Sequence, residues 1–149
     1  MSSQAPKKIA IDHDNYHAKH IGWTSDGRQF FLTTPFEPGG LGRQGNEFVA
    51  LYLFDSNGIL LEAIIDEFGP RDTMDEEKRR RVYEQRLTDL GQVTFQRIEI
   101  APFSIGRFGT TLGLIPQPPE EDGDEWSVEL HPGNVMAFFE PWDSGDYDT

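Results

Sequence analysis

Residues 47–66, EFVALYLFDSNGILLEAIID, decide the fold of this chain. Successive side chains of a β-strand point to opposite faces, and the segment Glu47–Phe54 is apolar on both of them. One face carries Val49, Leu51 and Leu53, and the other carries Phe48, Ala50, Tyr52 and Phe54. An apolar run of this kind predicts a central strand that is covered on both sides.

The rest of this stretch predicts a hairpin. Asp55-Ser56-Asn57-Gly58 offers an Asn-Gly pair, which favours a tight reversal because glycine adopts positive φ without strain. The returning strand is expected at Ile59–Asp66. Its apolar face should hold Ile59, Leu61, Ala63 and Ile65.

Two more hairpins are expected from Gly-containing turns between apolar runs. They are His17–Thr24 with Arg28–Thr34, and Trp126–His131 with Asn134–Glu140. In the last of these strands we expect Val135, Ala137 and Phe139 to face the core. Further strands are predicted at Val93–Ile100, with a bulge between Phe95 and Ile98, and within Ser104–Ile115.

A helix is predicted after residue 73. Thr73 and Glu76 have the spacing of a capping box, and acidic residues fill the first turn, where the helix dipole favours them. Gly91 is suited to end the helix. Its apolar stripe comprises Val82, Tyr83, Leu87 and Leu90.

These elements predict an α+β fold, a mainly antiparallel sheet of hairpins with one long helix packed on a face. A partly closed β-barrel with one helix is the alternative. A length of 149 residues predicts a single domain over residues 1–149. Residues 1–8 are expected to be a loose leader, and the composition of the acidic tail, residues 142–149, favours disorder.

Charge is distributed unevenly along the chain. Residues 1–107 hold all 13 Lys and Arg residues and 16 of the 26 acidic residues, so ten units of the net charge of −13 fall in residues 108–149. Such acidity argues against nucleic-acid binding and suits a partner with a basic surface. No signal peptide and no apolar run of about 18 residues is present, so we expect a cytoplasmic protein without a membrane helix.

The leading functional prediction is a non-enzymatic interaction protein that binds a basic protein partner. Aromatic side chains interleaved with carboxylates provide contact area and electrostatic steering. The predicted partner-binding residues are Trp142, Asp143, Asp146, Tyr147, Asp148, Asp122, Asp124 and Glu125. Size, acidity and the hairpin–helix–hairpin order are similar to those of immunity proteins that neutralise basic nuclease toxins. This likeness implies an inhibitor or immunity-like factor, and it involves no diagnostic residue.

A small metal-dependent enzyme is the second hypothesis. His13, His17 and His20 would share one face of a helix and could then hold Zn²⁺ or another divalent metal, whereas a strand would separate His17 from His20. Surface histidines in a polar entry segment are the simpler interpretation, with no cofactor. A third hypothesis is a structural or small-ligand-binding domain, in which Phe30, Phe48 and Tyr52 either line a cavity or fill a core.

The chain lacks the usual catalytic signatures. It has no cysteine, no Gly-x-Ser-x-Gly elbow and no Walker loop, and the Gly-x-Gly-x-x-Gly spacing of residues 40–45 falls in a loop expected between two hairpins, so no catalytic residue is identified. The dense basic cluster Lys78–Arg86 has two interpretations. It could bind phosphate or the acidic C-terminal segment, or it could form a charged solvent face paired with Glu76, Glu77 and Glu84.

Overall fold

The computed structural model describes residues 5–14, 18–40, 42, 44–121, 123–133, 136–142 and 145–147, the last three by their backbone alone. This described part of the chain forms thirteen strands and one helix. In chain order the elements are β1 (Ile9–Ile11), β2 (His20–Thr24), β3 (Gln29–Thr33), β4 (Phe36–Glu37), β5 (Asn46–Phe54), β6 (Leu60–Glu67), α1 (Glu76–Asp89), β7 (Val93–Phe95), β8 (Ile98–Ile100), β9 (Phe103–Arg107), β10 (Thr110–Gln117), β11 (Ser127–His131), β12 (Met136–Phe138) and β13 (Gly145–Tyr147).

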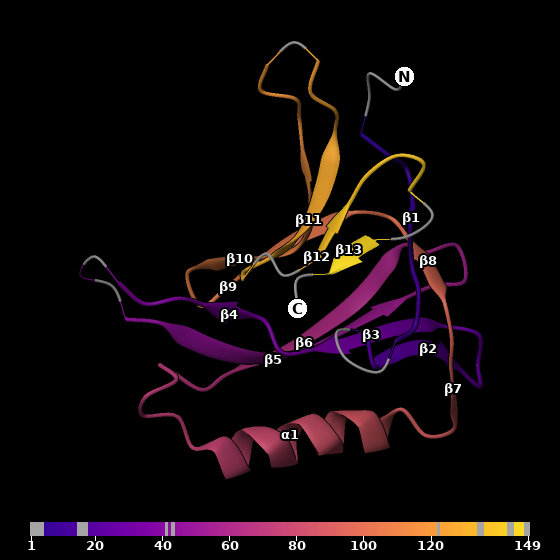
Figure 1. The fold of residues 1–149 in the computed structure, drawn as a ribbon. Coiled ribbons are helices and arrows are strands. Elements are labelled where there is room, and N and C mark those ends of the chain that lie inside the picture. Colours follow the sequence, from indigo (N-terminus) through magenta and orange to yellow (C-terminus); the bar gives the residue numbers. More distant parts are fainter. Residues whose placement is uncertain are drawn as a thin grey trace.

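The strands form three sheets, and the pairings among them are antiparallel. The six-stranded sheet has the order β4-β5-β3-β2-β7, with β6 paired to β5. The five-stranded sheet has the order β13-β12-β11-β10-β9, and β1 pairs with β8. Helix α1 lies against one face of the six-stranded sheet, and the five-stranded sheet lies on the opposite side (Figure 1).

The predicted α+β arrangement, mainly antiparallel strands with one helix on a sheet face, is confirmed for the described residues. Two parts of the prediction are wrong. Helix α1 has 14 residues and is short rather than long. The sheets are open, so the alternative of a partly closed barrel does not apply.

Strand β5 is covered on both faces, as its sequence predicts. One face contributes to a helix-side cluster, which consists of Phe30, Leu32, Val49, Leu51 and Leu53. The other face contributes to an inter-sheet cluster. Its members are Ile9, Ile11, Ala18, Ile21, Phe31, Ala50, Tyr52, Phe54, Ile98, Ile100, Leu114, Val128, Leu130, Met136 and Phe138.

Helix α1 packs through its predicted stripe, and Val82, Tyr83, Leu87 and Leu90 lie against the helix-side cluster. The predicted cap at Thr73 is wrong. Thr73 belongs to the preceding turn, where its N–H donates to the Pro70 carbonyl at 3.2 Å.

Asp75 is the N-cap instead, and its carboxylate accepts from the Lys78 N–H at 3.1 Å. A carboxylate at this position also interacts favourably with the helix dipole. At the other end Gly91 has φ of +75° and its N–H donates to the Thr88 carbonyl at 3.0 Å, which confirms the predicted end of the helix.

The returning strand β6 keeps only part of its predicted apolar face. Ala63 and Ile65 pack against the inter-sheet cluster, but Ile59 and Leu61 are 53% and 57% exposed. The pairing moves from Leu53 opposite Glu62 to Phe54 opposite Leu60. Leu61 is therefore the extra residue of a bulge, and Leu60 takes the inward position.

The segment Val93–Ile100 is two strands in two sheets. Strand β7 pairs with β2, and β8 pairs with β1. The change of apolar phase between Phe95 and Ile98 therefore marks a crossing between sheets, and the predicted bulge is wrong.

The third hairpin forms, with its last strand in the opposite phase to the prediction. Phe138 lies opposite Val128 in the register, and Met136 and Phe138 are buried while Phe139 is exposed. Val135 lies outside the described residues. Sequence Ser104–Ile115 contains a further hairpin, β9–β10, which turns at Phe108 and Gly109 with φ of 53° and 72°.

Within the acidic tail, Gly145–Tyr147 forms β13, which pairs with β12. The leader is described only from residue 5, and β1 begins at Ile9. Helix α1, the helix of the described residues, lacks the length and apolar character needed to cross a membrane.

The two leucines Leu51 and Leu61 test the packing of the β5–β6 pair. Leu51 is 2% exposed in the helix-side cluster, so Leu51→Ala should lower the free energy of unfolding by about 2–5 kcal/mol. Leu61→Ala should change it by no more than about 0.5 kcal/mol because that side chain is exposed. Urea unfolding curves measure both, and equal losses would contradict the assigned bulge.

Candidate functional site

The longest projection of the described structure is the end of the hairpin β10–β11. The strands pair from Gly113 opposite His131 to Gln117 opposite Ser127, and the connector continues beyond them. Figure 1 shows this hairpin rising away from the body of the protein. We call residues 115–129 the acidic arm.

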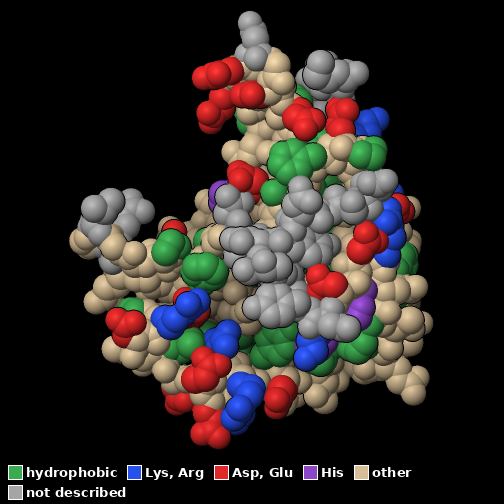
Figure 2. Space-filling view, in the orientation of Figure 1, with side chains coloured by type: hydrophobic (Ala, Val, Ile, Leu, Met, Phe, Trp, Pro, Cys, Tyr) green, Lys and Arg blue, Asp and Glu red, His purple; other side chains and the backbone are tan. Residues whose placement is uncertain are grey.

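Carboxylates gather on the arm. Glu120, Glu121, Asp124 and Glu125 are exposed, and Asp122 lies outside the described residues. The Asp124 N–H donates to the Glu121 carbonyl at 3.1 Å, and the Glu121 N–H donates to Asp124 Oδ2 at 3.2 Å. These two bonds hold the loop in a turn. Asp and Glu side chains are concentrated at the outer end of the projection in Figure 2.

An open groove of about 490 Å³ runs along the arm. Phe139, which is 37% exposed, lies at its wall. The other lining residues are Gln117, Pro118, Pro119, Glu120, Gly123, Asp124, Glu125, Ser127 and Glu129. An apolar ring surrounded by carboxylates gives this surface both a contact area and a negative charge.

The predicted site residues of the tail are only partly described. Trp142 packs against the inter-sheet cluster, its N–H donates to the Phe139 carbonyl at 2.8 Å, and its carbonyl accepts from Ala10 N–H at 2.9 Å. Trp142 therefore contributes to packing at the base of the arm. Asp146 and Tyr147 are placed by their backbone in β13, and Asp143 and Asp148 lie outside the described residues.

The predicted metal ligands divide in a similar way. His13 Nε2 donates to the Lys19 carbonyl at 2.9 Å, and its ring stacks on Phe95 with centroids 5.9 Å apart. His20 is the first residue of β2, and His17 lies outside the described residues. The helix that would gather the three rings does not form at the two described histidines. In the described part of the chain no three His, Asp or Glu side chains are grouped to hold a metal ion.

The third hypothesis concerned three aromatic residues, and all three are fully buried. Phe30 belongs to the helix-side cluster and Tyr52 to the inter-sheet cluster, where its ring meets Phe103 edge-on with centroids 4.7 Å apart. Phe48 stacks on Phe108 at 6.2 Å. The Tyr52 hydroxyl has no hydrogen-bond partner among the described residues, and burial raises its pKa.

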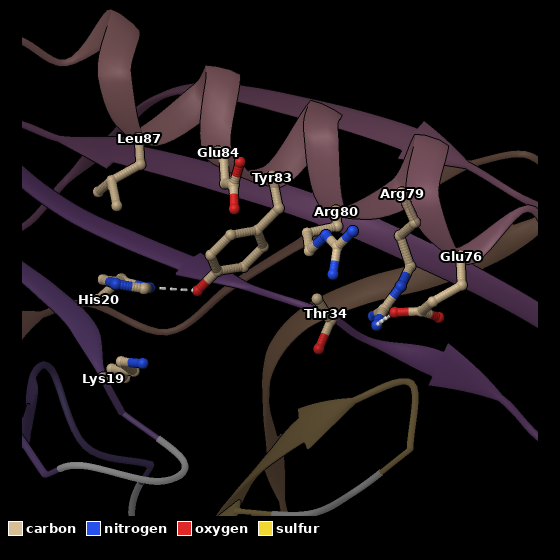
Figure 3. Close-up of a pocket in the computed structure, with 9 residues that line it drawn as sticks. All are labelled: Lys19, His20, Thr34, Glu76, Arg79, Arg80, Tyr83, Glu84 and Leu87. Atoms are coloured by element: carbon tan, nitrogen blue, oxygen red, sulfur yellow. Dashed lines mark hydrogen bonds and ion pairs between the residues drawn. The ribbon is translucent and has the colours of Figure 1, made fainter.

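A second groove, of about 530 Å³, is lined by one side of α1 and by residues 19, 20 and 34 on the sheet side. We call it the helix–sheet groove. Its lining residues, drawn in Figure 3, are Lys19, His20, Thr34, Glu76, Arg79, Arg80, Tyr83, Glu84 and Leu87. Tyr83 reaches down from α1 to β2, where a hydrogen bond of 2.5 Å joins its hydroxyl oxygen to His20 Nδ1.

Two side chains in this groove have shifted pKa values. Burial lowers the pKa of His20 below its ordinary value of 6.5, and the charge of Lys19 and the neighbouring His13 lower it further. Burial raises the pKa of the Tyr83 hydroxyl to about 12. Both side chains are therefore neutral near pH 7, and the hydroxyl keeps its proton.

The basic cluster Lys78–Arg86 is distributed around the helix. Arg79 Nη2 lies 2.6 Å from Glu76 Oε1, and Arg80 pairs more loosely with Glu77 at 3.7 Å. Arg86 reaches the sheet and pairs with Asp66 at 2.9 Å. The charged face thus forms through pairs three residues apart, rather than the spacing of four expected for Glu76, Glu77 and Glu84, and through one pair to β6.

Sequence reasoning named the basic cluster but missed that Arg79 and Arg80 share a groove with Lys19 and His20. The available signal was Tyr83 in an apolar stripe, because a buried hydroxyl needs a polar partner on the facing element.

Comparisons with protein-family models, with curated proteins and with solved structures gave no match for this chain.

His20 is expected to titrate below pH 6.5 in the folded protein. Lys19→Gln should raise the pKa of His20 by removing a nearby positive charge, and Lys7→Gln, on an exposed segment away from the groove, should leave it unchanged. NMR titration of the imidazole signals measures all three proteins. A His20 pKa at or above 6.5 would contradict the burial described here.

The same shift has a defined effect on stability. Because the unfolded chain binds a proton at His20 more readily than the folded protein does, the stability linked to His20 is fully present above pH about 6.5. It is lost as the pH falls through the lower pKa of the folded state.

Proposed function

We propose that this protein is a non-enzymatic binding protein that presents its acidic arm to a basic protein partner. The observation that carries the proposal is that exposed carboxylates on a projecting hairpin share a groove with the exposed ring of Phe139, which follows β12. Projection makes the surface accessible to a partner without rearrangement of the sheets.

Charge supports the same partner class. Residues 108–149 contain ten acidic residues and no Lys or Arg, and their one histidine, His131, lies 3.8 Å from Glu129. Carboxylates without lysine or arginine neighbours in the same segment create a negative potential that steers a basic surface toward them. The tail residues Asp143, Asp146 and Asp148 extend this charge along the sequence.

The groove along the arm also contains an apolar anchor, Phe139. Aromatic side chains at the centre of an interface often carry much of the binding energy, and a rim of polar groups excludes water around them. Phe139 has this relation to Glu120, Asp124 and Glu125, which line the same groove. A partner that inserts an aliphatic or arginine side chain into the groove would contact both the ring and the carboxylates.

The form of this function that we propose is inhibition, in which the arm covers a basic functional surface of the partner, as an immunity-like factor would. The absence of cysteine suits a reducing compartment, so we propose a cytoplasmic setting.

Removal of charge from the arm should weaken partner binding. In a variant with Glu120→Gln, Glu121→Gln and Glu125→Gln, we expect affinity to fall by about tenfold or more at low salt, because three steering charges are lost. The wild-type protein and the variant are used as baits in lysate of the native host. Captured proteins are identified by mass spectrometry, and each is then purified for titration at two salt concentrations.

The matched control carries Glu62→Gln, Asp72→Asn and Glu99→Gln, three exposed residues outside the arm, and changes the net charge equally. A basic protein that binds wild type and control but not the arm variant, more weakly as salt rises, supports the proposal. Equal capture by the arm variant, or no basic protein captured, would sink it.

A second variant tests the tail by changing Asp143, Asp146 and Asp148 to Asn. Weaker binding would include the tail in the interface, and unchanged binding would confine the interface to the arm.

Phe139→Ser tests the contribution of the apolar ring to binding separately from that of the carboxylates. Since the ring is only partly buried, with 37% of it exposed, the free energy of unfolding should fall by no more than about 1–2 kcal/mol, while affinity for the captured partner should fall by about tenfold. Isothermal calorimetry with the purified partner measures the affinity. Full affinity in this variant would remove Phe139 from the interface.

A further inference from the structure

The helix–sheet groove lies away from the acidic arm and has a different character. Three of its lining residues are Lys or Arg, and two are Glu, in a chain of net charge −13. Figure 3 shows the Arg80 side chain extending from α1 into the space above Thr34, with Arg79 on the same side of Tyr83, while Lys19 lies next to His20 at the other end of the groove. The lining thus has one more positive than negative side chain, with Arg79 paired to Glu76 and Arg80 paired more loosely to Glu77, where an acidic protein would otherwise repel an anion.

Arg79 has unused hydrogen-bonding capacity in this groove. One guanidinium nitrogen is engaged by Glu76, but Arg79 Nε is buried and has no hydrogen-bond partner among the described residues. A guanidinium group offers five N–H donors in a fixed plane, and such a group matches the oxygens of a carboxylate or phosphate. A small rotation of this side chain toward the groove would give Nε an anionic acceptor.

The other end of the groove is apolar and held in place. The ring of Tyr83 and the side chain of Leu87 form the wall on α1, and the Tyr83–His20 hydrogen bond fixes the ring against β2. His20 is also in contact with Phe95, with ring centroids 5.5 Å apart. A ligand body placed here would meet a preformed aromatic and aliphatic surface.

We propose that the helix–sheet groove binds a small organic oxyanion, a carboxylate or phosphate ester with an apolar body. Its anionic oxygens contact Arg79 and Arg80, and its apolar part lies on Tyr83 and Leu87.

The two glutamates limit the size and charge of the ligand. Glu76 is neutralised by Arg79, which holds the pKa of that carboxyl below its ordinary value, while Glu84 remains exposed at the rim. With only one more Lys or Arg than Glu in the lining, the groove suits a single anionic group. A polyanion such as a nucleic acid would meet these glutamates and the acidic surface beyond them.

The test is a titration of the full chain with three probes, phenyl phosphate, benzoate and neutral benzyl alcohol, followed by NMR of backbone and arginine Nε–H signals. We expect at least one of the two anions to bind with a Kd near or below about 1 mM and to shift the Arg79 and Arg80 signals. Benzyl alcohol should bind at least about tenfold more weakly. The comparison of phenyl phosphate with benzoate decides which oxyanion is preferred.

Neighbouring residues of the same helix provide a matched control. Arg79→Gln with Arg80→Gln should weaken anion binding by about tenfold, whereas Lys78→Gln with Arg81→Gln, an equal charge change outside the groove lining, should alter it by less than about twofold. Arg80→Gln alone, at an exposed side chain, should also weaken binding, and it tests the groove if the Arg79 variant fails to fold.

Three results would overturn the proposal. They are the absence of binding by both anions, equal binding of benzyl alcohol, and equal weakening by the Lys78 and Arg81 control. None of them bears on the acidic arm, which lies in another layer of the protein.

Discussion

The burial of β5 on both of its faces is the constraint on which the rest of the structure depends. Leu51 and its same-face neighbours require an apolar cover, which α1 provides, and Tyr52 and Phe54 require another, to which the five-stranded sheet contributes. A single strand therefore organises three layers. It also separates the two candidate sites, because the helix–sheet groove and the acidic arm lie on opposite sides of the same sheet (Figure 1).

Local sequence was sufficient where one short-range rule governed the outcome. The double apolar alternation of β5, the turn ending at Gly58 and the helix end at Gly91 each depend on residues a few positions apart. Local sequence was not sufficient where the pairing with another strand decides which side chains face the core. Leu61 moved outward because one extra residue enters the pairing with β5, and Phe139 lies outside because Phe138 is placed opposite Val128.

The two sites differ in the same respect. The charge of the arm is visible in sequence because five carboxylates fall within residues 120–125, so their exposure follows from composition alone. The helix–sheet groove joins His20 to Tyr83 across 63 positions of sequence. Its assembly requires the order of β2, β3 and β5 and the placement of α1 on that face, and none of these is encoded in one segment. A motif search reads single segments and therefore passes over such a groove.

Gln96 and Arg97, the two residues between β7 and β8, connect the six-stranded sheet to the β1–β8 pair. An extended chain advances at most about 3.6 Å per residue, so these two residues keep the ends of β7 and β8 close together. On one side of the link, Phe95 of β7 is paired with Gly22 of β2. The two strands approach so closely there that a Cβ on Gly22 would come within 1.9 Å of the Thr94 carbonyl oxygen. On the other side of the link, β8 is paired with β1. If the β1–β8 pair moved away from the six-stranded sheet, it would pull on β7, the edge strand of that sheet. Amide protons in the two sheets should therefore exchange with solvent as one cooperative unit.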